Sequence, residues 1–199
     1  MLSSICTIDQ VVMDYIQSYF SNVGFRGDEL SNILEAFELR TFGKNDLFVT
    51  EGKVSRQIGI VGSGIFQYYA NKDGVEITSY VSVPNTWIAS VRSFVSETPS
   101  LENIRALTSG ELYLISKSAL KRLVGEVPGF KDFYINLLEQ SISGIDESRH
   151  DLIVLTADQR YAKLLQNEPH LLQQIPLQHL ASMLGITPRH LSRIRATIR

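Results

Sequence analysis

The spacing of apolar residues divides the chain into segments with two different periods. Over residues 8–39 apolar side chains recur every three or four positions, which predicts two helices separated by a turn at 22–27. Between Phe42 and Leu114 the apolar runs are short and broken by glycine, and Asp73-Gly74 stands between two alternating runs as a hairpin signal. Short strands at this spacing predict a jelly roll or barrel rather than a βαβ sheet.

The helical period returns after Ser116 and continues to the end of the sequence. Residues 130–155 contain no proline, and they carry a seam at alternating four- and three-residue steps: Tyr134, Leu138, Ser141, Ile145, Ser148, Leu152 and Leu155. A seam of this kind is typical of two helices that wind around each other, and it predicts a homodimer. A helix packed on its own β domain is the alternative source of such a pattern.

A new helix is expected to begin just after that seam. Thr156 is followed three residues later by Gln159, the signature of a capping box, and this places a hinge near 155–156. We therefore predict an α+β chain in three parts. They are helices plus a jelly-roll sensor-like domain over 1–127, a long dimerisation helix over 128–155, and a small all-helical domain over 156–199.

The last part of the chain has the pattern of a helix-turn-helix. This motif needs a small residue in its first helix, a glycine in the turn and apolar residues at fixed offsets, because two helices must pack closely at a set angle. Ala181 and Gly185 meet the first two needs, and Thr187-Pro188 supplies a helix cap followed by a favoured first helical residue. The apolar positions are Leu180, Leu184, Ile186, Leu191 and Ile194. An ordinary helical hairpin would need few of these features together.

The second helix of this motif carries the candidate DNA-binding residues. Its N-terminal part normally enters the major groove, where an arginine can donate two hydrogen bonds to guanine. Arg189 and Arg193, four residues apart, suit that role, and Arg195 and Arg199 suit phosphate contacts. The full candidate set is Thr187, Arg189, His190, Ser192, Arg193, Arg195 and Arg199, in which His190 is as readily a packed or solvated residue as a contact.

The charge distribution agrees with a nucleic-acid partner, although the net charge of −2 alone does not. Residues 176–199 hold four arginines and no acidic residue, a charge of +4, so the rest of the chain carries −6. The single cysteine, Cys6, forms no intrachain disulfide, and the sequence begins without the pattern of a secretory leader. Because no stretch is apolar enough to span a bilayer, we expect a cytoplasmic protein with no membrane partner.

Taken together, these segments resemble the Crp/Fnr family of transcription regulators. The resemblance covers nearly the whole chain and rests on FGKNDLFVTEG at 42–52, IVGSGIFQYY at 60–69 and LASMLGITPRHLSRIR at 180–195. It implies a jelly roll like that of cyclic-nucleotide-binding domains, a homodimer about the long helix, and binding of double-stranded DNA under the control of a small-molecule effector.

Two departures from the family pattern matter. The family usually places a β-wing after the recognition helix, whereas this sequence stops at Arg199, so a wing is either absent or cut off and its phosphate contacts are not counted. The family's nucleotide cassette carries a Gly-Glu pair and an Arg-Ser pair, but here there is no Gly-Glu, and Ser100-Leu101 aligns with Arg-Ser. We therefore expect an effector other than cAMP, with candidate pocket residues Tyr80, Trp87, Ser90, Arg92, Ser93 and Asn103.

Two other function classes compete with a regulator. A metal-dependent cupin would need clustered imidazoles in its barrel, but all four histidines (His150, His170, His179 and His190) lie beyond the β segment. Because Walker, nucleophile-elbow and paired-carboxylate signatures are also missing, we expect neither an enzyme nor a cofactor or catalytic metal. The second alternative is a ligand-binding or protein-interaction module whose helix-turn-helix is only structural.

Overall fold

The β domain is a jelly roll built from two antiparallel four-stranded sheets, as the sequence predicts. The computed structural model describes residues 15–197, apart from the side chains at positions 170 and 171. The sheet orders are β1-β8-β3-β6 and β2-β7-β4-β5. The strands are β1 (Phe37–Phe42), β2 (Leu47–Val49), β3 (Gln57–Ser63), β4 (Phe66–Lys72), β5 (Val75–Ser82), β6 (Trp87–Ile88), β7 (Asn103–Ala106) and β8 (Gly110–Ser116).

Side chains from both sheets meet in the interior of the roll. This cluster includes Phe66, Ile88, Ile104 and Leu112, each of which is fully buried. The predicted hairpin is confirmed: β4 and β5 pair, and Asp73 and Gly74 between them have φ of 53° and 81°. Positive φ at both turn residues matches the right-handed twist of the two strands, which explains the Asp-Gly pair.

One predicted helix ends earlier than the sequence pattern suggested. Residues 15–23 and α2 (Gly27–Leu34) are helical, but Phe37 and Leu39, which the pattern assigned to helix, belong to strand β1. They pair with Ile115 and Tyr113 of β8. The apolar spacing fits both a helix and an alternating strand over so few residues, and the pairing with β8 decides between them.

A second apolar cluster joins the flanking helices to the outer face of the first sheet. Phe20, Phe25, Phe130 and Phe133 form tilted and edge-to-face aromatic pairs there, with ring centroids 5.4–6.4 Å apart. Helix α3 (Val91–Ser96) lies between β6 and β7, and the helices after β8 are α4 (Lys117–Glu126), α5 (Phe130–Val154), α6 (Ala157–Asn167), α7 (Pro169–Gln174), α8 (Leu177–Met183) and α9 (Pro188–Thr197).

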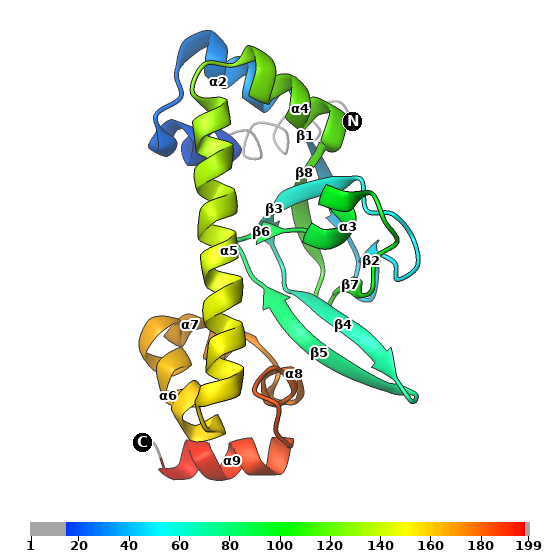
Figure 1. Ribbon diagram of the computed structural model, residues 1–199, viewed down its shortest axis with the longest axis vertical. Helices are drawn as coiled ribbons and strands as arrows, with labels where there is room; N and C mark the ends of the chain where they lie inside the picture. The colour runs from blue at the N-terminus through cyan, green and yellow to red at the C-terminus, as the bar shows by residue number, and fades with distance from the viewer. Residues whose placement is uncertain (1–14, 198–199) are drawn as a thin grey trace, which may run out of the picture.

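The long helix α5 runs from the β domain to the helical domain (Figure 1), and several of its apolar side chains are exposed. Its first residue, Phe130, is fully buried, whereas Ile142 and Ile145 are 66% and 59% exposed. The other strongly exposed apolar residues of this helix are Ile135, Leu152, Ile153 and Val154. A single chain therefore leaves several apolar residues of α5 exposed, among them Ile145 and Leu152 of the predicted seam.

Candidate functional site

Helices α8 and α9 form the helix-turn-helix geometry that the sequence predicts. Leu180, Ala181 and Leu191 are fully buried between them, so the small residue does allow close approach. Gly185 has φ +67°, a conformation that a residue with a Cβ adopts only with strain. The turn is closed by hydrogen bonds from Gly185 N to Ser182 O and from Ile186 N to Ala181 O, both 2.9 Å.

The N-terminal part of α9 presents polar side chains to solvent. Thr187 caps the helix, because its Oγ1 accepts a hydrogen bond of 3.2 Å from the His190 backbone N–H. Arg189 and Arg193 are exposed, and within residues 15–197 neither guanidinium forms a hydrogen bond or ion pair. Ser192 is exposed and donates to Pro188 O, while His190 is half-buried. The arginine side chains are therefore the groups free to reach a ligand.

Arg195 has a different environment from the one expected of a phosphate contact. Its Nη2 donates a hydrogen bond of 3.3 Å to Leu172 O, and its guanidinium lies 6.0 Å from the centre of the Tyr161 ring. These contacts join α9 to α7 and α6, so Arg195 takes part in the packing of the helical domain, and its contact with phosphate stays a prediction. Arg199 lies outside the described residues.

The hinge between α5 and the helical domain is held by charged side chains of α6. The predicted capping box is present, with Gln159 N donating to Thr156 Oγ1 and Thr156 N donating to Gln159 Oε1. Arg160 donates to Leu155 O at 2.5 Å and to Leu184 O at 2.6 Å. These carbonyls end α5 and α8, where the helix dipole favours a positive charge. The Arg160 side chain thus connects the C-terminal ends of α5 and α8.

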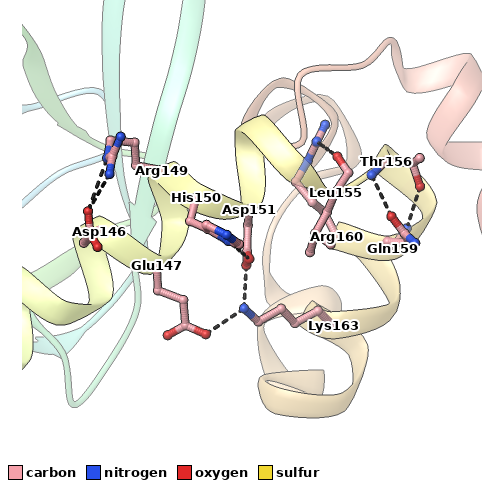
Figure 2. Close-up of polar contacts among 10 residues, drawn as sticks. All are labelled: Asp146, Glu147, Arg149, His150, Asp151, Leu155, Thr156, Gln159, Arg160 and Lys163. Atoms are coloured by element: carbon pink, nitrogen blue, oxygen red, sulfur yellow. Dashed lines mark hydrogen bonds and ion pairs between the residues drawn. The ribbon is translucent and has the colours of Figure 1, made fainter.

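A second contact across this hinge is an ion-pair cluster, which Figure 2 shows between α5 and α6. Lys163 Nζ lies 2.6 Å from both Glu147 Oε1 and Asp151 Oδ2. Hydrogen bonds to Asp151 and Glu147 raise the pKa of the Lys163 ammonium, so it stays charged at neutral pH. Because Lys163 and Glu147 remain in contact with solvent, which screens the pairs, these contacts orient α6 more than they stabilise the fold.

The candidate effector cassette comprises residues 87–94 and 99–103, and its serines form hydrogen bonds within this region and with neighbouring loops. Ser90 and Ser100 are almost fully buried, and their hydroxyl oxygens lie 3.0 Å apart. Ser93 donates to Thr98 O at 2.6 Å and accepts a hydrogen bond from Ser55 N. The serines that the sequence singled out are thus used to fold the loop around α3.

The charge at the centre of this cassette is negative. Glu102 Oε1 accepts a hydrogen bond of 3.3 Å from Ser90, and burial raises the pKa of this carboxyl while the Ser90 hydrogen bond opposes the rise. Arg92 is exposed, and its Nη1 donates to Pro99 O at 3.3 Å. Arg105 is turned elsewhere, toward Gln67.

The remaining pocket candidates are scattered. Trp87 packs in the cluster outside the roll, where its Nε1 donates to Tyr19 Oη at 2.9 Å, so the structure does not bring it to the serines of the cassette. Asn103 is buried and bonded to Glu51 through both ends of its amide. Tyr80 is 46% exposed and stands edge-to-face with Tyr68, 5.5 Å between centroids.

Sequence reasoning missed Glu102 and Tyr68, which lie within or beside the cassette. Tyr68 Oη accepts from Ala89 N at 3.1 Å, and burial raises the pKa of its phenol. An acidic residue two positions after the aligned Ser100 was the available signal for the charge. No sequence signal links Tyr68 to Ala89, because β4 and the β6–α3 turn meet only in the folded roll.

Two classes of site leave no trace in the described residues. Across 15–197, histidine, cysteine and acidic side chains do not gather in threes that could hold a metal ion. Among the helices of the same range, none is both long and apolar enough to cross a bilayer.

Comparisons with known proteins agree with this architecture. Residues 39–126 match the family described as the cyclic nucleotide-binding domain. No curated protein sequence matches the chain. Among solved structures, FixK2 from Bradyrhizobium japonicum has a TM-score of 0.69 at 14% identity, over 81% of this chain and 84% of that one.

Two further structures are similar over most of their length. A CooA mutant from Carboxydothermus hydrogenoformans has a TM-score of 0.67 at 16% identity, covering 86% of this chain and 80% of that one. The c-di-GMP responsive global regulator CLP from Xanthomonas campestris has a TM-score of 0.62 at 17% identity, covering 85% and 90%. Residues 39–126 therefore match the cyclic nucleotide-binding domain family, and the chain has the fold that these Crp/Fnr-type regulators share, with a C-terminal helical region that fits a helix-turn-helix domain.

Proposed function

We propose that this protein is a DNA-binding transcription regulator of the Crp/Fnr type, rather than an enzyme. The observation that carries the proposal is the exposed pair Arg189 and Arg193 on α9, a helix whose apolar side is buried against α8. Guanidinium groups on one face of such a helix match the acceptors of guanine in the major groove. The positive charge of residues 176–199 supports the same partner.

The proposed regulator acts as a homodimer through α5. The uncovered apolar face of that helix, with Ile142 and Ile145 at its centre, supports a second copy as its occupant because helix seams of this type close by two-fold symmetry. Two α9 helices would then stand about 34 Å apart, one turn of DNA, and read two half-sites.

DNA binding is tested first with a random duplex, before any operator is known. We expect the protein to shift a labelled duplex of about 30 base pairs at low salt, with affinity that falls steeply as salt rises, because phosphate contacts release counterions. An operator is then selected from random sequence. A protein that fails to bind at low salt, or whose binding does not respond to salt, is instead the module with a purely structural helix-turn-helix.

We also propose that the effector is neither cAMP nor cGMP. A cyclic phosphate held in the roll is a buried anion, which needs a cationic partner to offset its desolvation. Here the cassette places the carboxyl of Glu102 beside Ser90, and the Arg92 guanidinium faces Pro99 O at the surface. The fold neighbour CLP is described as responsive to c-di-GMP, so this fold is not confined to cAMP.

Calorimetric titration tests this directly. With either cyclic nucleotide at about 1 mM we expect no heat beyond dilution. Saturable binding with a Kd of about 50 µM or tighter, lost in Arg92→Ala, would mean that Arg92 swings into the roll and supplies the missing charge. Arg40→Ala, which removes an exposed arginine from β1, is the matched control.

A further inference from the structure

The first helix of the helix-turn-helix closes the free edge of a sensor sheet. Strand β5 is the last strand of its sheet, so its outward backbone groups have no neighbouring strand. The Ser182 hydroxyl of α8 supplies both partners at one position: Thr78 N donates to Ser182 Oγ at 2.8 Å, and Ser182 Oγ donates to Thr78 O at 3.3 Å. Figure 1 shows the β4–β5 hairpin reaching toward α8.

Apolar contacts make this a packed joint. Val81 and Val83, at the end of β5 and just beyond it, are 1% and 2% exposed. They belong to the same cluster as Leu180, Ala181 and Leu184 of the helix-turn-helix. The sensor hairpin and the helical domain therefore share a core, and whatever loosens the joint frees α8 and the helix α9 that it carries.

A buried histidine sits at the polar side of this joint. His179 of α8 is 8% exposed, and its Nδ1 lies 3.2 Å from Thr78 Oγ1. Thr78 Oγ1 also accepts a hydrogen bond of 2.8 Å from Gln67 Nε2. On its other side, His179 Nε2 lies 3.2 Å from Gln178 Nε2. A neutral imidazole completes this row of hydrogen bonds when its Nδ1 donates to Thr78 Oγ1 and its Nε2 accepts from Gln178 Nε2.

Two charged groups face the imidazole from the sheet. Arg105 of β7 donates to Gln67 Oε1 at 2.8 Å and pairs with Glu76 of β5 at 2.5 Å. A cavity of about 250 Å³ opens onto the same side chains, which gives water and protons access to the ring. Its lining consists of Gln67, Glu76, Thr78, Gln178, His179 and Ser182.

We propose that His179 is a proton-operated catch between the two domains: the neutral imidazole holds α8 on strand β5, and the protonated imidazole releases it. The catch is a regulatory device for DNA binding, so that part of the inference rests on the proposed function. Holding α8 on the sensor fixes the position of α9, whereas a released domain loses orientational freedom each time it binds DNA.

Protonation disrupts the joint for three reasons. The imidazolium donates from both nitrogens, so Nε2 no longer accepts the hydrogen bond of Gln178 Nε2 and its N–H faces that amino group instead. The charge is also poorly solvated and lies near the Arg105 guanidinium. Burial and, next, Arg105 therefore lower the pKa of His179 below its ordinary 6.5, while Glu76 opposes the shift.

The direction of the pH effect follows from this lowered pKa. The docked state binds fewer protons than the released state, so docking is strongest above about pH 6.5, the pKa of a released imidazole, and weakens as the pH falls through and below it. At a pH below both the docked and the released pKa of His179, each unit by which docking lowers this pKa reduces the equilibrium constant for docking about ten-fold.

Amide hydrogen exchange of the full-length protein tests the catch without DNA. The Thr78 amide donates to Ser182, so its protection factor, corrected for intrinsic exchange, reports docking. Between about pH 7.5 and about pH 5.5 we expect this protection to fall in the unmodified protein and in His150→Gln, but not in His179→Gln. Equal protection at both values, or an equal fall in His179→Gln, would overturn the proposal.

The imidazole itself provides a readout that needs no variant to fold. In the unmodified protein, the His179 ring signal in an NMR titration should move with a midpoint below 6.5, together with the Thr78 exchange rate. A midpoint at or above 6.5, or one unrelated to the exchange of Thr78, contradicts the catch.

The link to DNA is measured separately by fluorescence anisotropy at the same two pH values. We expect the unmodified protein to lose more affinity on acidification than His179→Gln does. An equal loss in both would overturn the regulatory role even where exchange shows release. A protein that binds no DNA at either pH refutes the proposed function instead, and the exchange experiment still decides the catch.

Discussion

Replacing Ile145 by aspartate is expected to convert the proposed dimer into a monomer. In the single chain this side chain is 59% exposed, so an aspartate there costs an isolated monomer almost nothing. In a two-fold seam through α5 the same carboxylate is buried twice and has no cationic partner, which costs several kcal/mol. Sedimentation velocity at about 10 µM separates the two states, because a dimer with a Kd well below this concentration stays assembled and one with a Kd well above it dissociates.

DNA affinity should fall with the dimer. A protomer that binds one half-site alone loses the local concentration supplied by its partner, which is worth about 100-fold or more. Measured by fluorescence anisotropy, the affinity of Ile145→Asp for an operator with two half-sites should therefore fall far more than its affinity for a duplex with a single half-site.

Ser143→Asp is the matched control for this substitution. It adds the same charge two residues earlier on α5, at an exposed position outside the apolar face. We expect it to remain a dimer with unchanged operator affinity. If Ile145→Asp and the analogous Ile142→Asp also remain dimers, the seam on α5 is not the interface.

The features that the sequence predicted well are those set by neighbours in the chain. Gly185 is needed because the turn requires positive φ, and Thr156 with Gln159 caps a helix through contacts only three residues apart. The Asp73-Gly74 turn is local in the same sense. For each of these, residue type and spacing contain nearly all the physical information.

The features that the sequence could not predict depend on contacts between distant segments. Arg195 is of the residue type expected for a phosphate contact, but its guanidinium also donates to Leu172 O and lies over the Tyr161 ring. Thr78 and Ser182 are 104 residues apart in sequence and meet only because the hairpin reaches the helical domain. No periodicity of a single segment encodes such a pairing.

The apolar residues that α5 leaves exposed coincide only in part with the seam that the sequence predicts. Ile145 and Leu152 of the predicted seam are exposed, but Leu155 is half-buried at the hinge, where its carbonyl accepts from Arg160. Ile135 and Ile142, outside the predicted seam, are exposed as well. A heptad pattern can be placed on a helix in neighbouring registers, and the covered side of α5 determines which register is free.

The double substitution Arg189→Ala with Arg193→Ala should abolish sequence-specific DNA binding while the fold is retained. Both side chains are exposed, and neither guanidinium forms a hydrogen bond or ion pair within residues 15–197 that the alanines would remove. Each bidentate contact to guanine is worth about 1–3 kcal/mol, so the pair accounts for a factor of roughly 30 to 10⁴ in operator affinity. Anisotropy on the selected operator and on a scrambled duplex measures that loss.

The loss must be specific to sequence as well as large. Removing base contacts lowers affinity for the operator more than for the scrambled duplex, so the ratio of the two collapses toward one. Lys121→Ala with Arg122→Ala is the control, because it removes the same two positive charges from exposed positions on α4, which lies at the opposite end of the molecule from α9 in Figure 1. If the arginine pair weakens both duplexes equally, Arg189 and Arg193 hold phosphates, and base reading belongs to other residues of α9. If the pair changes neither, α9 is not the recognition helix.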